Sequence, residues 1–334
     1  MMRSALTSLC LLLLLLCSGC MSTFPEPLPP DGGTYRVHSV IRFQMMRRDF
    51  LLHIPPGYTP QTPLPLVVVL HGAFSTAAQT EQESGFSELA DTEQFLVAYP
   101  EGIGLFGYLQ HWNAGHCCGK AAEDKIDDVG FVAAVIETVA QHLEVDLQRV
   151  YLVGMSNGGM LTYRFAAEQG ELLAAAAVVS GALGSSMVGT PKWQMPETAP
   201  PLSLLIIHGD DDLHIPPAGG GSPLPGRAAR RYLSLQQALD YWLTADGCSD
   251  PPQHRTEHAG GLDRLTWHNC RNATQLERIL LKNWKHQWPA PFFTTQLPAD
   301  APLHGYNATR DIWDFFVNAT DTSLSAETTV QPSH

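Results

Sequence analysis

The hydrophobic positions of the chain form short continuous runs that alternate with longer segments of helical periodicity. Leu64–Leu70 contains only leucine, valine and one proline, which is typical of a strand buried on both faces of a parallel sheet. In Asp127–Leu143 the apolar residues recur every three or four positions, which predicts a helix with one buried face. The same patterns predict strands at Tyr35–Phe43, Asp49–Ile54, Phe95–Tyr99, Arg149–Val153, Ala174–Val179, Leu202–Ile207 and Leu276–Leu281, and helices at Ser84–Glu93, Met160–Gln169, Leu233–Ala245 and Ala308–Val317.

This alternation predicts the fold class. Strands separated by helices pair in parallel and carry helices on both faces of the sheet, whereas the first two strands have no helix between them and are expected to form a hairpin. We therefore predict an α/β fold with a mostly parallel central sheet, helices on both faces and an N-terminal antiparallel hairpin. Three segments interrupt the alternation, and we expect them to form walls of a cleft at the carboxyl edge, where ligands bind: Tyr108–Asp124, Gly184–Pro201 and Pro216–Arg231.

The N-terminal segment has the composition of an export signal. Arg3 precedes an apolar run at Leu9–Leu16, which is too short for a transmembrane helix. The small residues before Cys20 resemble a bacterial lipobox, whose cysteine is lipidated after cleavage, although Cys17 stands where a leucine is usual. Cleavage without lipidation is the alternative. We predict a signal peptide at residues 1–20, a tether at 21–34, one folded domain at 35–318 and a flexible tail at 319–334, in a protein that is secreted, periplasmic or an outer-membrane lipoprotein.

Composition restricts the partners of the chain. Its 334 residues are 44% hydrophobic, which suffices for one large domain with a sizeable core. A formal net charge of -13 disfavours nucleic acid and anionic membrane surfaces. We therefore expect no nucleic-acid partner, and a membrane contact only through the N-terminal lipid.

Four of the seven cysteines lie outside the predicted signal peptide. Exported proteins reach oxidising compartments, where cysteines pair. We expect Cys248 and Cys270 to form a disulfide. Cys117 and Cys118 are adjacent, and they are expected either to form a vicinal disulfide or to remain buried thiols.

A sharp turn is predicted where Arg149–Val153 gives way to a helix. Gly154-Met155-Ser156-Asn157-Gly158 fits G-x-S-x-G, in which a serine stands on a strained strand-to-helix turn and the glycines let the strand and helix approach closely. The first amides of the helix lack internal acceptors, so the amide of Asn157 is a candidate donor to an oxyanion. The alternative interpretation is a glycine-rich turn capped by a serine.

A nucleophilic serine needs a base, and the base needs an acid that orients it. On this kind of turn the acid and then the histidine follow the serine along the chain. His286 is the first histidine after the strand Leu276–Leu281, and His304 is the second candidate. Three aspartates follow the strand Leu202–Ile207, and spacing alone does not choose among them: Asp210, Asp211 and Asp212.

A second oxyanion donor is expected from the turn after Leu64–Leu70. His71-Gly72-Ala73 forms that turn, and the backbone amide of Ala73 is the simplest candidate. The His71 side chain is expected to brace the turn and to take no part in the chemistry.

Several motifs together resemble the secreted polyhydroxyalkanoate (PHB) depolymerases and feruloyl esterases, a branch of the α/β-hydrolase superfamily. The resemblance extends from Leu66 to Val317. Its motifs are Leu70-His71-Gly72, Trp112-Asn113-Ala114-Gly115, Cys117-Cys118-Gly119, Asp127-Asp128-Val129-Gly130-Phe131, Gly154 to Met160, His208-Gly209, Ile215-Pro216 and Trp288-Pro289.

The resemblance selects among the open alternatives. Asp212 is the fifth residue of the H-G-x-x-D motif of these enzymes, and His286 stands two residues before their Trp-Pro pair. Cys248 and Cys270 match the last cysteine pair of the family. The chain departs from the family at Trp284 and Lys285, where glycines are usual, and this departure is expected to narrow the cleft.

The resemblance also implies a function for residues 35–318. It implies a serine ester hydrolase that needs no cofactor and no metal, in which Ser156 attacks, His286 accepts the proton and Asp212 orients the ring. Ala73 and Asn157 then supply the oxyanion amides, and Trp112, Asn113 and Trp288 are expected to line the substrate cleft. PHB-type oligoesters are the first substrate hypothesis, with feruloyl or acetylxylan esters as the alternative.

Two functions of other classes are the alternatives to a serine hydrolase. A metal hydrolase would use five nearby residues of ligand type, but their spacing fits no zinc motif: His111, His116, Cys117, Cys118 and Asp124. A non-catalytic binding lipoprotein would be expected to lack a member of the triad. Ser156, Asp212 and His286 are all present, which favours an enzyme.

Overall fold

The structure is a computed structural model that describes residues 31–37, 42–43, 46–105, 108–187, 194–225 and 229–320. The predicted signal peptide with Cys20, most of the predicted tether and nearly all of the predicted tail lie outside the described residues. They therefore stay predictions. Among the described helices, none combines the length and the apolar character that a membrane crossing requires.

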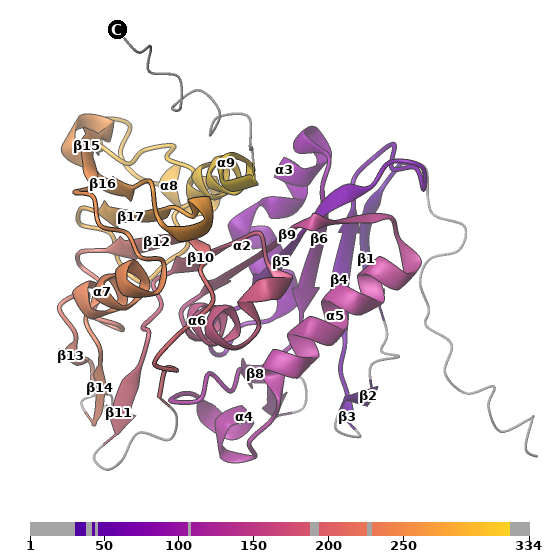
Figure 1. Cartoon of the computed structure of the whole chain (residues 1–334), viewed down its shortest axis with the longest axis horizontal. Helices are drawn as coiled ribbons and strands as arrows, with labels where there is room; N and C mark the ends of the chain where they lie inside the picture. The colour runs from indigo at the N-terminus through magenta and orange to yellow at the C-terminus, as the bar shows by residue number, and fades with distance from the viewer. Residues whose placement is uncertain are drawn as a thin grey trace, which may run out of the picture.

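A ten-stranded sheet forms the centre of the molecule (Figure 1). The six consecutive strands from Leu96–Pro100 to Leu276–Leu281 run parallel to one another, and antiparallel strands extend the sheet at both edges. The predicted mostly parallel sheet with an antiparallel N-terminal hairpin is confirmed. The strand order is β1 (Gly33–Val37), β4 (Phe50–Ile54), β6 (Leu96–Pro100), β5 (Leu64–Leu70), β9 (Val145–Met155), β10 (Ala175–Val179), β12 (Ser203–Gly209), β17 (Leu276–Leu281), β16 (Leu262–Trp267) and β15 (Gln253–Glu257).

Helices cover both faces of this sheet and enclose two cores (Figure 1). Strand β5 shows why its sequence is continuously apolar. Leu66 and Val68 lie in one core, while Val67 and Val69 lie in the other, because successive side chains of a strand point to opposite faces. The first core includes α5 (Asp128–His142), α6 (Asn157–Gln169) and α7 (Leu235–Ala245), and the second includes α2 (Ala77–Ser84), α3 (Phe86–Glu93) and α9 (Ala308–Thr320).

The structure differs from the sequence prediction in two regular elements. The helix predicted at Ser84–Glu93 is preceded by a separate helix, α2, and the two are divided at Gly85, whose φ of 69° forms a left-handed cap. The sheet also continues beyond β17 through β16 and β15, which the sequence analysis did not predict. Strand β15 is entirely polar and largely exposed, so it lacks the apolar alternation by which strands are recognised.

The segments that interrupt the alternation contain further small elements. A three-stranded sheet joins two of them, with the order β11 (Ser185–Met187), β14 (Arg230–Tyr232) and β13 (Gly220–Gly221). The other short elements are β2 (Arg42–Phe43), β3 (Met46–Arg47), β7 (Ile103–Leu105), β8 (Tyr108–His111), α4 (Gly119–Glu123), α8 (Pro291–Thr294), η1 (Gly170–Leu172), η2 (His258–Gly260) and η3 (Arg271–Ala273).

Two disulfides are present within the described residues. Cys248 pairs with Cys270, and the adjacent Cys117 and Cys118 pair with each other. The thiol alternative for the adjacent pair is therefore not what the structure shows. The Cys248–Cys270 bond ties the end of α7 to the segment that leads into β17.

Replacing both Cys248 and Cys270 by alanine should lower the free energy of unfolding by about 3 kcal/mol. The bond closes a loop across a sequence separation of 22 residues, and its loss returns that loop's entropy to the unfolded chain. Urea unfolding of the oxidised wild type and the double variant measures the difference. An unchanged midpoint, with thiol titration confirming the disulfide in the wild type, would contradict this prediction.

Candidate active site

Ser156 stands between β9 and α6 with φ of 55° and ψ of -117°, a strained conformation for a residue with a side chain. The glycines around it are required by space. A Cβ on Gly154 would lie 2.4 Å from the carbonyl carbon of Gly158, and a Cβ on Gly158 would lie 2.5 Å from the carbonyl oxygen of Leu70. The local sequence therefore builds a turn that holds the serine at the carboxyl end of β9.

The loops after three parallel strands bring Ser156, His286 and Asp212 together. Ser156 Oγ lies 2.8 Å from His286 Nε2, and His286 Nδ1 lies 2.7 Å from Asp212 Oδ2. Asp212 is only 1% exposed, and its Oδ1 accepts hydrogen bonds from the backbone amides of His214 and Ile215. Asp210 and Asp211 are exposed, so of the three competing aspartates it is Asp212 that contacts the imidazole.

Asp212 is charged in this setting. Burial raises the pKa of its carboxyl group, but hydrogen bonds from the rings of His208 and His286 and from the Ile215 amide bring the pKa well below its usual range. An ionised carboxylate accepts the proton of His286 Nδ1. The Nε2 atom is then free to accept the Ser156 proton, which is the tautomer that general-base catalysis requires.

The turn after β5 lies against Ser156, since a Cβ on Gly72 would be 3.5 Å from the Ser156 Cβ. His71 braces this turn. Its Nδ1 lies 2.7 Å from the Gly72 carbonyl oxygen, and its Nε2 accepts a hydrogen bond from the Gly102 amide. Burial lowers the pKa of His71 to about 4, so the ring is neutral and donates through Nδ1. Because the peptide is planar and trans, the Ala73 N–H then points away from the His71 ring.

Trp112 and Asn113 do not line the pocket at Ser156, so that prediction is wrong. The Trp112 side chain is 0% exposed and lies in the core. It contacts both turns that carry the candidate oxyanion donors: its Nε1 donates to the carbonyl of His71, and its backbone N–H and C=O bind the side-chain amide of Asn157. Asn113 is also buried, and its side chain donates to the Ile126 carbonyl.

The buried ion pair between Arg48 and Asp128 holds the loop that contains Trp112 and Asn113. Asp128 accepts hydrogen bonds from the Asn113 amide at 2.7 Å and from Arg48 at 2.8 Å. Neither Arg48 nor Asp128 has a role predicted from the sequence. The two adjacent aspartates at the start of α5 were the available signal, because Asp127 caps the helix and a second carboxylate there needs another partner.

Ser156 opens into a pocket of about 260 Å³. Ala73, His286 and Trp288 line it, so Trp288 lies at the predicted cleft, with its Nε1 donating to Thr309 Oγ1. Trp284 does not line this pocket. It is buried and donates to the Gln287 carbonyl. Lys285 does not line the pocket either, so the expected narrowing by these two residues is not seen at Ser156.

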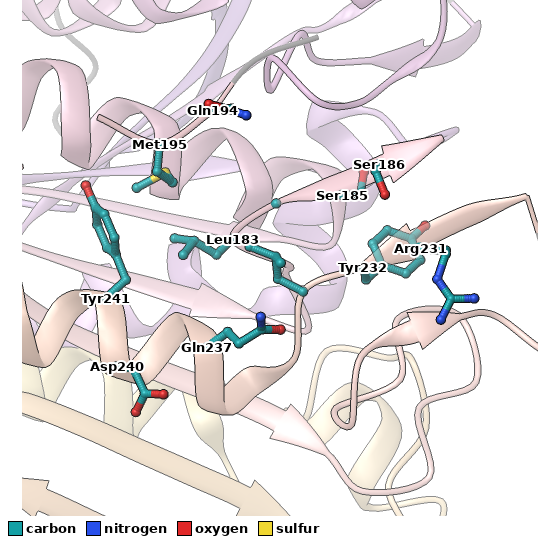
Figure 2. Close-up of a pocket in the computed structure, with 12 residues that line it drawn as sticks. Leu183, Ser185, Ser186, Gln194, Met195, Arg231, Tyr232, Gln237, Asp240 and Tyr241 are labelled. Carbon is teal, nitrogen blue, oxygen red and sulfur yellow. The ribbon is translucent and has the colours of Figure 1, made fainter. Parts of the chain in front are cut away.

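The described residues of Gly184–Pro201 and Pro216–Arg231 supply none of the lining of that pocket. They instead border a second pocket of about 650 Å³, which lies between the small sheet and α7 (Figure 2). Its apolar lining comes from Leu183, Met195, Tyr232, Leu233 and Tyr241. The expectation that these segments form the walls of the serine's cleft is therefore wrong, because they fold against α7. The third segment, Tyr108–Asp124, also contributes no lining residue at Ser156.

The residues considered for a metal hydrolase are used otherwise in the structure. Cys117 and Cys118 bind each other, so they cannot act as thiolate ligands. His116 is buried with its Nδ1 against Ser185 Oγ. Asp212, His214 and His286 lie close enough to share an ion, but the carboxylate and the His286 ring already bind each other and Ser156.

Comparisons with known proteins show what the chain is similar to. The sequence model of a family described as esterase PHB depolymerase matches residues 48–189. NocK of Nocardia uniformis subsp. tsuyamanensis, which carries the name of an esterase, is 29% identical over 260 residues, covering 74% of this chain and 72% of NocK. The chain is therefore similar to known esterases. Feruloyl esterase B of Piromyces equi is 26% identical over 240 residues, and the match covers 72% of this esterase but only 42% of that protein.

A solved structure supports the same fold for this esterase. The acetyl xylan esterase of Aspergillus awamori superposes with a TM-score of 0.56, covering 77% of this chain and 94% of that one. At 16% identity this similarity concerns the fold alone. The expectation of a carboxylic ester hydrolase of α/β-hydrolase fold is confirmed.

Proposed function

We propose that Ser156, His286 and Asp212 are the catalytic triad of this esterase. The observation that carries the proposal is the continuous hydrogen-bonded chain from Ser156 Oγ through the imidazole to the Asp212 carboxylate. Ser156 Oγ attacks the ester carbonyl carbon while His286 Nε2 takes its proton, and the departing alcohol then takes that proton from His286. Water then attacks the acyl-enzyme carbonyl while His286 Nε2 takes its proton, and the acyl–Oγ bond breaks as that proton passes to Ser156 Oγ, which releases the acid.

We propose that the amides of Ala73 and Asn157 bind the oxyanion of each tetrahedral intermediate. Ala73 lines the same pocket as Ser156, and the Asn157 amide lies in the first turn of α6, where it has no carbonyl acceptor within the helix. The Trp112 contacts support this assignment, because one residue holds both His71 and the Asn157 side chain in place. Removal of one such donor typically costs roughly 3–4 kcal/mol of transition-state stabilisation.

We propose that PHB-type oligoesters are the substrates, with feruloyl or acetylxylan esters as the alternative. The family description supports the first and the similarity to a feruloyl esterase supports the second. A pocket of about 260 Å³ accommodates one short acyl or alcohol group, which favours soluble oligomers over a crystalline polymer. Export through residues 1–20, with or without a lipid on Cys20, agrees with two disulfides in the described chain.

A panel of esters tests this proposal on the purified protein. The panel contains p-nitrophenyl butyrate, a 3-hydroxybutyrate trimer, methyl ferulate and acetylated xylan, and a serine-directed fluorophosphonate labels the nucleophile. We expect hydrolysis of at least one member and a single phosphonate adduct on Ser156. A folded wild type that hydrolyses none of them and takes no label would contradict the proposal and favour a binding lipoprotein.

A further inference from the structure

One wall of the pocket at Ser156 is formed by helix α2 and carries polar side chains. Gln79 and Glu83 are four residues apart and lie on one face of the helix, and both line the pocket with Ser156. Ser75 and Thr80 belong to the same wall. A pocket that received only an apolar group would be lined mainly by hydrophobic side chains, so this wall indicates a polar part of the ligand.

Glu83 differs from the other carboxylates of its surroundings. Within the part of the chain that the structure describes, this half-buried side chain makes no hydrogen bond and no ion pair, and the pocket lining contains no lysine or arginine. Its neighbour Glu81, in contrast, accepts a hydrogen bond from Ser87 Oγ at 2.7 Å. Burial raises the pKa of Glu83, as expected of a partly desolvated carboxylate without a compensating cation. Contacts within the fold therefore do not explain why a carboxylate stands at position 83. A ligand that donates a hydrogen bond to it would explain this.

The neighbouring groups favour a hydroxyl as that donor. An ionised carboxylate only accepts hydrogen bonds, while the Gln79 side-chain NH2 and the Thr80 hydroxyl can donate; the Ser75 hydroxyl already donates to Gln79 Oε1 at 3.4 Å. A hydroxyl group both donates and accepts, so it can use both kinds of partner. An ammonium group on the ligand would donate to Glu83 but could not accept from Gln79, so it would use only one kind of partner. A carboxylate on the ligand would be repelled by the charge of Glu83.

We propose that Gln79 and Glu83 form a subsite that binds a hydroxyl group of the ester substrate and excludes a carboxylate at that position. The hydroxyl belongs either to the acyl chain, as in a hydroxy-acid ester, or to the alcohol, as in a polyol or sugar ester. The inference rests on the proposed hydrolysis at Ser156. It identifies α2 as the element that selects hydroxylated over plain esters.

Two matched substrate pairs test the subsite and distinguish its two sources. Ethyl butyrate and ethyl 3-hydroxybutyrate differ in the acyl chain, while ethyl acetate and 2-hydroxyethyl acetate differ in the alcohol. We expect the wild type to prefer the hydroxylated member of one pair by about tenfold in kcat/KM, the size of one hydrogen bond to a charged group. Glu83→Leu should reduce this ratio to about one, and Glu83→Gln should leave an intermediate ratio.

An anionic ester gives a second readout that a loss of folding cannot imitate. Mono-p-nitrophenyl succinate carries a carboxylate, and Glu83→Gln should raise kcat/KM for it several-fold relative to p-nitrophenyl butyrate, because the like charge is removed. Glu88→Gln is the matched control, since Glu88 is an exposed carboxylate of α3 outside this pocket. That variant should behave as the wild type in both assays.

The possible outcomes separate the subsite from the function on which it rests. Unchanged ratios in both Glu83 variants, or a wild-type preference for a trimethylammonium ester over both hydroxylated esters, would overturn the subsite alone. A wild type that hydrolyses no ester would overturn the proposed function and the subsite with it.

Discussion

Ser156→Ala should lower kcat for ester hydrolysis on the order of 10⁶-fold, the loss typical of removing the nucleophile from a serine triad. The hydrogen-bonded chain from Ser156 to Asp212 has no other nucleophile at its end. KM should change little, because the pocket and the oxyanion amides are left intact. Initial rates with p-nitrophenyl butyrate, together with phosphonate labelling, measure the effect.

The strain at Ser156 supplies a matched control. At a φ of 55° the Cβ of alanine causes the same steric strain as that of serine, whereas glycine, which has no Cβ, adopts this conformation readily. Ser156→Gly should therefore be as inactive as Ser156→Ala but should have a higher melting temperature. Substantial hydrolysis by a well-folded Ser156→Ala protein, unaffected by the phosphonate, would assign the nucleophile elsewhere.

Much of the fold, and the approach of Ser156, His286 and Asp212 to one another, could be predicted because these features depend on short-range patterns. A strand buried on both faces must be continuously apolar, and β5 is. A serine on a strained turn needs glycine on both sides, and Gly154 and Gly158 are in contact with backbone atoms that leave no room for a side chain. The choice of Asp212 among three neighbouring aspartates could not be made from the sequence pattern alone. Its burial and its contact with His286 depend on how the loop after β12 folds.

The features that were missed depend on the environment of a residue. Trp112 was expected at the cleft because an aromatic residue in an irregular segment has no periodicity to show which way it points. Its indole N–H and its backbone find partners in His71 and Asn157, 41 and 45 residues away. The segment Gly184–Pro201 was misplaced for the same reason, because a strand as short as β11 pairs with β14 through contacts that its own sequence does not encode.

The role of Asp212 leads to the second large effect, because Asp212→Asn should lower kcat by about 10⁴-fold. The amide can donate to His286 Nδ1, so the ring would carry its proton on Nε2 and could no longer accept the Ser156 proton. The side chain keeps its size, and its Oδ1 atom can still accept the backbone amides of His214 and Ile215. The loss should therefore appear in kcat at an almost unchanged melting temperature.

The two neighbouring aspartates are the natural controls, since the sequence offers all three as acids. Asp210 is exposed and accepts a hydrogen bond from the Asn283 amide at 2.6 Å, and Asp211 is exposed as well. Asp210→Asn and Asp211→Asn should each keep kcat within about threefold of the wild type, as expected of surface substitutions outside the reacting groups. If Asp211→Asn lost activity while Asp212→Asn kept it, the acid would be misassigned, although Ser156 and His286 would stand. Three single substitutions assayed on one ester therefore separate burial from proximity in sequence as the property that defines the acid of this triad.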